Sequence, residues 1–240
     1  MRQNRLFTQQ ALIANASLEL EPEPAHHLAR VLRARVGDEV LLFNGDGLDW
    51  QAHIHRIEKR RVVVHIGASV PSIAESPLSS HLGLCLSKGE RFDWAIQKAT
   101  ELGVTQITPL MSARVDVKLP EDRLAKKLTH WQHVVIAACE QCGRSRIPSL
   151  NPPTDLKHWI SVVEADLKLV LHHHQAAALP EAAPGEVALL VGPEGGLTDD
   201  EVASACQQGF QRLRIGPRVL RTETAPAAAL AIMGSRWGDL

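Results

Sequence analysis

The pattern of apolar and polar residues divides the chain into two parts that meet near residue 70. In the first part, short apolar runs such as 40–43 and 61–66 are separated by glycine-containing turns, and Asn-Gly-Asp-Gly at 44–47 is a strong hairpin signal. The pattern also predicts a helix over about 24–34 and a strand over 51–57. Several short strands joined by glycine turns indicate a small β-barrel.

The second part alternates strands with helices. Residues 68–80 are rich in proline and serine, which indicates a linker. Beyond it, apolar runs predict strands at 82–86, 104–110, 167–171, 187–191 and 213–215. Helical periodicity predicts helices at 92–102, 121–142, 154–163, 199–208 and 225–237. We therefore expect two domains, residues 1–72 and residues 73–240, the second an α/β domain with a mainly parallel sheet.

Composition and charge exclude several classes of protein. The 240 residues are 45% hydrophobic and carry a net charge of −1, which excludes a disordered chain and a globally basic surface for nucleic acid. No apolar run approaches the ~18 residues of a membrane span, and no secretory signal follows Met1. We therefore expect a cytoplasmic protein that does not bind membranes, in which any RNA-binding surface is a local arginine patch.

The cysteines predict neither a disulfide framework nor a metal site. Cys139 and Cys142 have C-x-x-C spacing, and His130 and His133 lie upstream three residues apart. A structural zinc site needs a second pair or histidines at ligand spacing, so we expect no metal here.

A glycine-rich segment at 189–201 is the first candidate binding site. A buried strand leads into a loop with Gly192, Gly195 and Gly196, which allow positive φ and close backbone approach to a ligand, and a Thr198–Glu201 capping box then starts a helix. Open α/β sheets bind ligands at this end of a strand. The loop has neither the phosphate-loop lysine nor the G-x-G-x-x-G pattern. Its carboxylate, Glu194, favours a ligand that offers hydroxyl donors or positive charge.

A second strand–loop–helix segment spans residues 213–226. Its loop contains Gly216, two arginines and a glutamate, and is too polar to be a simple connection between buried elements. Thr224 is a plausible N-cap of the last helix, and Pro226 fits its first turn.

These two loops resemble those of the SPOUT superfamily of S-adenosylmethionine-dependent RNA methyltransferases. The matching residues are Gly-Pro-Glu-Gly-Gly at 192–196 and Ile-Gly-Pro-Arg-Val-Leu-Arg-Thr-Glu-Thr-Ala at 215–225. Lys-Ala-Thr-Glu-Leu-Gly-Val at 98–104 and Ala-Cys-Glu-Gln-Cys-Gly-Arg-Ser-Arg-Ile-Pro at 138–148 are similar to signatures of its RsmE family. The run 26–38, which begins His-His-Leu, resembles the PUA-like RNA-binding barrel of that family.

The resemblance implies a fold and an activity. The fold would be an N-terminal PUA-like β-barrel followed by a SPOUT α/β domain with a deep trefoil knot, in which the methyl donor binds. The protein would be a homodimer with active sites near the subunit interface. It would transfer a methyl group from S-adenosylmethionine, without a metal, to N3 of a specific uridine in 16S ribosomal RNA, within an assembled or assembling small subunit. A ribosome-assembly protein without catalysis and a nicotinamide-dependent oxidoreductase are the alternatives.

The resemblance also implies site residues. The donor-binding residues would be Leu171, His172, Val191, Gly192, Pro193, Glu194, Gly195, Gly196, Ile215, Gly216, Pro217, Val219, Leu220, Thr224 and Ala225. RNA phosphates would contact Arg30, Arg33, Lys88, Arg91, Arg114, Arg144 and Arg146. The three consecutive histidines at 172–174 would point to alternate faces of an extended segment, so they do not form a metal site.

The imide proton of uridine defines the candidate catalytic residues. Glu223 could accept that proton as a general base. Alternatively, Arg221 or Arg218 could stabilise the negative charge that develops on the uracil oxygens. The sequence leaves both possibilities open.

Overall fold

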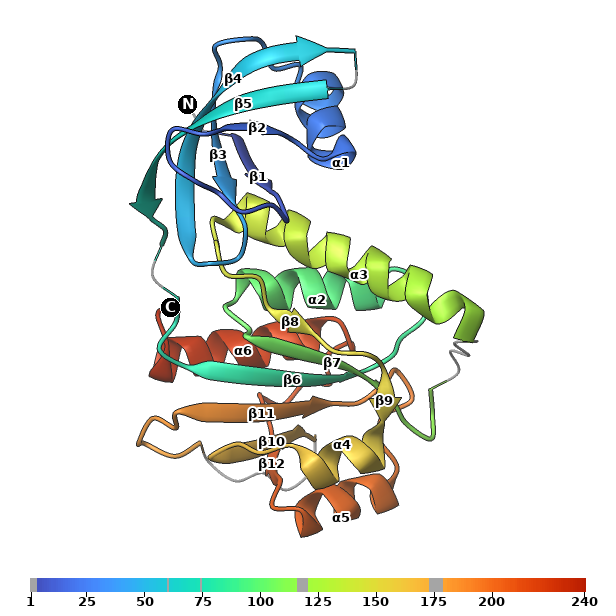
Figure 1. Cartoon of the computed structure of the whole chain (residues 1–240). Helices are drawn as coiled ribbons and strands as arrows, with labels where there is room; N and C mark the ends of the chain where they lie inside the picture. The colour runs from blue at the N-terminus through green and yellow to red at the C-terminus, as the bar shows by residue number, and fades with distance from the viewer. Residues whose placement is uncertain (1–3, 60, 74, 116–120, 173–178) are drawn as a thin grey trace. The chain divides into compact units, whose positions relative to one another are not determined.

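The protein consists of two compact units. The computed structural model describes residues 4–59, 61–73, 75–115, 121–172 and 179–240 (Figure 1). The N-terminal unit contains Met1–Ala74 and Cys139–Ile147, and the C-terminal unit contains Glu75–Ala138 and Pro148–Leu240. The residues 139–147 therefore belong, by their contacts, to the unit that precedes them in the chain.

The N-terminal unit is built on a five-stranded sheet with the order β1-β3-β4-β5-β2. Its elements are β1 (Asn4–Phe7), β2 (Ser17–Glu19), α1 (Pro22–His26), a π-helical turn η1 (His27–Val31), β3 (Glu39–Phe43), β4 (Leu48–Glu58) and β5 (Arg61–Pro71). The strands pair antiparallel except for β1, which lies parallel to β3. Leu28, Val40, Ile54 and Val64 are fully buried in its core, so η1 covers the apolar face of the sheet.

Several boundaries in this unit differ from the sequence-based predictions, since β4 and β5 are longer than predicted and the helix begins earlier. The helix ends at Val31 rather than residue 34, and Arg33 has φ +53°, which is incompatible with a continuing helix. The linker is also shorter than predicted. Ser69 and Pro71 pair with Trp50 and Leu48 in a long β4–β5 hairpin, and β6 already begins at Ser79.

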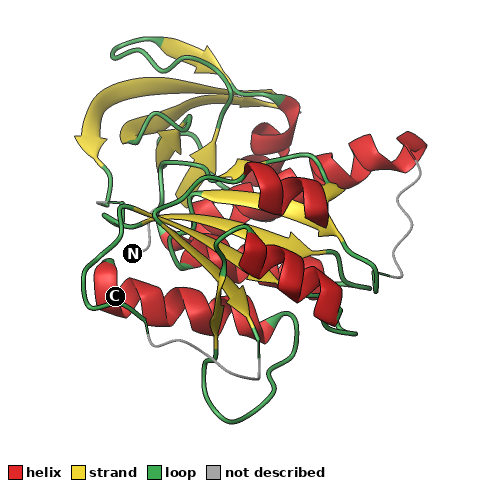
Figure 2. Cartoon of the chain, turned by 90° about the horizontal axis from the view of Figure 1, so that it is seen from below, coloured by secondary structure: helices red, strands yellow, loops and turns green. Residues whose placement is uncertain are grey.

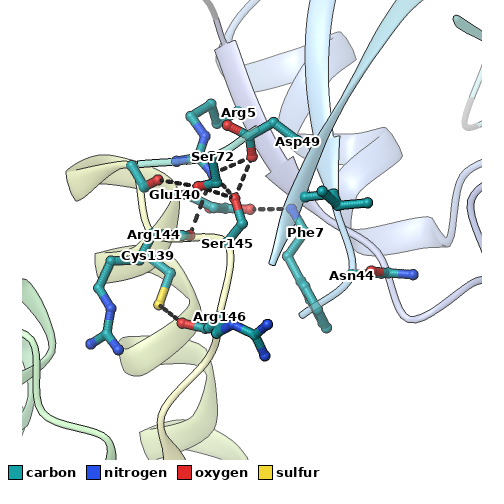
Figure 3. Close-up of polar contacts among 12 residues, drawn as sticks. Arg5, Phe7, Asn44, Asp49, Ser72, Cys139, Glu140, Arg144, Ser145 and Arg146 are labelled. Carbon is teal, nitrogen blue, oxygen red and sulfur yellow. Dashed lines mark hydrogen bonds and ion pairs between the residues drawn. The ribbon is translucent and has the colours of Figure 1, made fainter. Parts of the chain in front are cut away.

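The residues 139–147 are held in the N-terminal unit by a buried polar network (Figure 3). One guanidinium nitrogen of Arg5, Nη2, lies 2.7 Å from Asp49 Oδ1 and 2.8 Å from Ser145 Oγ. The Ser145 hydroxyl also hydrogen-bonds to Asp49 and lies 2.8 Å from Ser72 Oγ. The backbone N–H of Phe7 donates to Glu140 Oε1 at 3.0 Å. These contacts join β1, β4 and the residue after β5 to the last turn of α3 and the segment that follows it.

The C-terminal unit is a parallel α/β sheet, as predicted. Its elements are β6 (Ser79–Cys85), α2 (Arg91–Glu101), β7 (Gln106–Met111), α3 (Glu121–Cys142) up to Ala138, β8 (Ser149–Leu150), β9 (Thr154–Asp155), α4 (Leu156–Val162), β10 (Leu167–Leu171), β11 (Glu186–Val191), α5 (Asp199–Gln207), β12 (Gln211–Leu213) and α6 (Thr224–Trp237). The strand order is β12-β10-β11-β6-β7-β8, with β9 also paired to β7. Each of these pairs is parallel.

Helices lie on both faces of this sheet (Figure 2). Along β11, Ala188 and Leu190 pack in a cluster with residues of α4 and α5, whereas Leu189 points to the opposite face, as strand alternation requires. The indole of Trp159 in α4 lies directly on Gly83 of β6, where a Cβ would be 2.5 Å from a ring carbon. The central strands are therefore buried on both sides.

The first residues of α5 and α6 test the capping predictions. Thr198 and Glu201 form the predicted capping box at the start of α5. Thr224 is the first residue of α6 rather than its N-cap, and Glu223 precedes it without a side-chain cap, so that prediction was wrong. The strand predicted at 213–215 lies two residues earlier, because β12 pairs with β10 only through Leu213. Within the described part of the chain, no helix is long and apolar enough to cross a membrane.

Candidate functional site

The two predicted loops line a single cavity in the C-terminal unit. The strands β10, β11 and β12 are parallel neighbours, so their carboxyl ends meet at one edge of the sheet. A cavity of about 590 Å³ opens there, between the loops that follow β11 and β12. It is lined by every predicted donor-binding residue except Pro217 and Thr224, and by the predicted catalytic residues Arg218, Arg221 and Glu223. His173 and His174 lie outside the described residues.

Glycines shape both loops at three positions. Gly196 has φ +70° and Gly216 has φ +113°, conformations that side-chain-bearing residues rarely adopt. Gly192 is required for a different reason, since a Cβ there would lie 2.9 Å from Leu197 Cγ and 3.1 Å from its backbone nitrogen. The Gly196 N–H donates to Pro193 O at 2.8 Å and closes the turn. Neither Gly192 nor Gly195 has a positive φ, so the predicted left-handed conformation is found in this loop only at Gly196.

Two arginines predicted to bind RNA, both exposed, donate hydrogen bonds to the first loop. The guanidinium of Arg91 donates to Glu194 Oε1 at 2.9 Å, and that of Arg114 donates to the carbonyl of Gly195 at 2.9 Å. The backbone N–H of Lys88 also donates to Glu194 Oε1, at 3.0 Å. Burial alone would raise the pKa of Glu194, but hydrogen bonds from its own backbone N–H, from the Lys88 N–H and from Arg91 hold that pKa below its usual value. Glu194 is therefore an ionised anchor of the loop.

Glu223 lines the cavity, and one of its carboxylate oxygens is buried without a hydrogen-bond partner among the described residues. Its side chain is 17% exposed, and its Oε1 lies 4.0 Å from Arg221 Nη1. Its Oε2 is buried and has no hydrogen-bond partner among the described residues. A buried acceptor without a partner carries a free-energy cost that a bound donor removes. Arg221, in contrast, has a side chain that is 79% exposed.

The cavity also contains residues that the sequence analysis did not single out. They are Leu197, Leu213, Arg214 and Thr222. Arg214 Nε donates to the carbonyl of Gly216 at 3.0 Å and so braces the second loop. Arg214 and Thr222 lie within the polar 213–226 segment, so the polar composition of that segment could have identified them as site residues.

The remaining predicted RNA-binding residues differ in exposure. Arg30, Arg33, Lys88 and Arg146 are exposed. Arg144 is only 6% exposed, which argues against a phosphate contact through its guanidinium. The Arg146 guanidinium lies against the β3–β4 turn, where a Cβ on Gly47 would be 2.9 Å from its Nε. Among the described residues, no group of three or more histidine, cysteine or acidic side chains is arranged to hold a metal ion.

Comparisons with known proteins agree with this geometry. A family model described as an RNA methyltransferase domain matches residues 74–234, and one described as an RNA methyltransferase PUA domain matches residues 20–67. The chain is 34% identical over 239 residues to the ribosomal RNA small subunit methyltransferase E of Buchnera aphidicola, covering 98% of this chain and 97% of that protein.

Solved structures extend the similarity to the whole fold. A methyltransferase from Legionella pneumophila, solved in complex with S-adenosylmethionine, matches with a TM-score of 0.97 and 41% identity over 100% of both chains. The ribosomal RNA small subunit methyltransferase E of Neisseria gonorrhoeae, bound to S-adenosylmethionine, matches with a TM-score of 0.93 and 36% identity, again over 100% of both chains. These matches confirm the predicted order of a PUA-like domain and a SPOUT methyltransferase domain. The chain therefore belongs to the ribosomal RNA small subunit methyltransferase E family.

Proposed function

We propose that this protein transfers a methyl group from S-adenosylmethionine to N3 of a specific uridine in 16S ribosomal RNA. The observation that carries the proposal is the cavity at the ends of β10, β11 and β12, which unites the two loops that resemble the donor-binding loops of the family. Family membership and the donor bound in the two solved relatives support the same conclusion.

The cavity suits a donor of this size and charge. Its volume of about 590 Å³ falls within the ~300–1,000 Å³ that is usual for cofactor sites. The glycine loops bring backbone N–H and C=O groups to its rim, where no side chain blocks the approach of a ligand. When bound, S-adenosylmethionine supplies a methyl group on a positively charged sulfur, and the protein contributes alignment with the nucleophile.

Glu223 is the better candidate for removing the uridine proton. The N3 nitrogen becomes a good nucleophile only as its proton leaves, and the Glu223 carboxylate, which lines the cavity, can accept that proton. Arg221, 4.0 Å from the other oxygen of the same carboxylate, would balance negative charge. We assign Arg218, which lines the same cavity, to charge stabilisation at the uracil oxygens.

RNA binding falls to the exposed cations. We assign phosphate contacts to Arg30, Arg33, Lys88 and Arg146, because their side chains are exposed. Arg91 and Arg114 are positioning residues for the 192–196 loop, because their guanidinium groups are used there. Affinity for RNA should decrease with salt, since binding of phosphates releases counterions.

The family resemblance extends the proposal to assembly, topology and location. We propose a homodimer whose subunit contact includes α6, where Ile232 is 41% exposed. We also propose that the loops after β11 and β12 belong to a trefoil knot. The substrate would be the assembled or assembling small subunit in the cytoplasm.

Calorimetry and single-turnover kinetics test the proposed function. S-adenosylhomocysteine should bind the purified protein, whereas NAD should not; the reverse would identify an oxidoreductase. Glu223→Gln should retain donor affinity and lose about 10²–10⁴-fold in the rate of methyl transfer to 16S ribosomal RNA. A wild-type protein that binds small subunits and never methylates them would be an assembly factor, and the proposal would be wrong.

A further inference from the structure

A second hollow opens beside the donor cavity. It is lined by Lys88, Gly89, Glu90, Arg91, Trp94, Glu223 and Thr224. Arg91 and Glu223 line both spaces, so these two side chains form their common wall. A group that occupies the second hollow therefore lies next to the carboxylate that faces the donor cavity.

The hollow contains an exposed tryptophan. Trp94, in the first turn of α2, is 42% exposed, whereas Trp131, Trp159 and Trp237 are at most 7% exposed. The ammonium of Lys98 lies 6.0 Å from the Trp94 ring centroid and is itself 2.7 Å from Glu101. The indole is thus held by neighbours on its own helix and still presents apolar surface among charged residues.

The remaining groups of the hollow fit a nucleotide. Lys88 and the half-exposed Arg91, whose guanidinium also holds Glu194, are cationic, and the carboxylates of Glu90 and Glu223 supply acceptors for the edge of a base. Proteins bind unstacked RNA bases by stacking them on aromatic rings and by hydrogen bonding to their edges. An enzyme that modifies a base must also take it out of its stack, and an aromatic platform compensates for the lost stacking.

We propose that this hollow receives the target uracil, which stacks on the indole of Trp94 and directs N3 towards Glu223. The inference rests on the proposed function and adds a substrate-binding residue to it. Trp94 acts on the bound base and does not contact the donor. Loss of the ring should therefore affect the RNA substrate and leave donor binding unchanged.

Three variants of the full-length protein test the proposal. Trp94→Ala should lower kcat/KM for 16S ribosomal RNA by about 10- to 100-fold, the usual worth of one base–aromatic stack, with unchanged affinity for S-adenosylhomocysteine. Trp94→Phe, which keeps an aromatic face, should stay within about threefold of wild type. Val162→Ala, which truncates a 56% exposed side chain in α4, is the control and should match wild type.

Tryptophan fluorescence reports contact between RNA and Trp94 directly. A purely structural role of Trp94 would not make its emission depend on RNA. RNA should quench part of the tryptophan emission of the wild type, and this part should be absent from Trp94→Phe. Wild-type kcat/KM in Trp94→Ala would overturn the proposal. A loss of activity in Trp94→Ala that higher protein concentration restores would also overturn the proposal. Such a loss would come from dissociation of subunits, and Trp94 would then lie in a subunit contact. A wild-type protein without methyl transfer would instead contradict the proposed function.

Discussion

The buried histidine of the C-terminal unit predicts how the stability of the protein depends on pH. His81 in β6 is 8% exposed, and its Nε2 lies 2.8 Å from Thr108 Oγ1. Trp159 Nε1 donates to the same nitrogen at 3.3 Å, so Nε2 is an acceptor and carries no proton. Burial lowers the pKa of His81 from 6.5 to about 4.

The sign and magnitude follow from proton binding. Below pH 6.5 the unfolded chain takes up a proton at residue 81, whereas the folded protein does not until about pH 4. The free energy of unfolding therefore decreases as the pH falls through this window and is not lowered further by His81 below it. At about 1.4 kcal/mol per pH unit, the full loss is about 3 kcal/mol.

Urea unfolding of the wild type and of His81→Gln measures this contribution. Glutamine retains an acceptor for Thr108 and Trp159 but does not titrate. Between pH 7.5 and pH 4.5 the wild type should lose about 2.5 kcal/mol more of its unfolding free energy than the variant. Carboxylates that titrate over the same pH range contribute equally to both proteins, so their contribution cancels in the difference. Equal pH dependence of both proteins would refute a buried, neutral His81.

Three further substitutions have expected outcomes. Gly192→Ala should weaken S-adenosylhomocysteine binding at least tenfold by calorimetry, because its Cβ would meet Leu197, whereas Gln207→Ala on α5 should bind normally. Gly83→Ala should lower the free energy of unfolding by about 1–3 kcal/mol in urea titrations, because the new Cβ overlaps an indole. Arg5→Ala should cost about 3 kcal/mol in the same assay, because it leaves a buried carboxylate unpaired. Unchanged values would contradict the packing or pairing invoked for each.

Local pattern predicted most elements of the second unit, although it missed the two-residue strands β8 and β9 and assigned the residues of β9 to the helix that follows. The helix at 121–142 and the strand at 167–171 have the predicted bounds, because each carries a clear apolar period. The short strands β1 and β2 were not predicted. β1 has only four residues, and its parallel partner β3 lies more than 30 residues further along the chain. Such pairings depend on long-range contacts that local periodicity does not contain.

The contacts of the charged residues also depend on long-range structure that the local sequence does not contain. Arg91, Arg114 and Arg144 were predicted to bind RNA as cationic side chains that could contact phosphates. Their surroundings differ, since Arg91 and Arg114 hold the 192–196 loop and Arg144 is buried. The assignment of 139–147 to the N-terminal unit likewise rests on contacts of Arg5 with residues about 140 positions away. A guanidinium in a sequence does not reveal whether it faces solvent, a carboxylate or a carbonyl.

Nucleoside mass spectrometry of 16S ribosomal RNA tests most directly whether this protein is a uridine-N3 methyltransferase. Small subunits from a strain without the gene would be incubated with the purified protein and S-adenosylmethionine that carries an isotopically labelled methyl group. The label should appear as 3-methyluridine at one position with the wild type, and at a rate about 10²–10⁴-fold lower with Glu223→Gln. Label in another nucleoside, or none at all with a protein that binds the donor, would contradict the proposed activity.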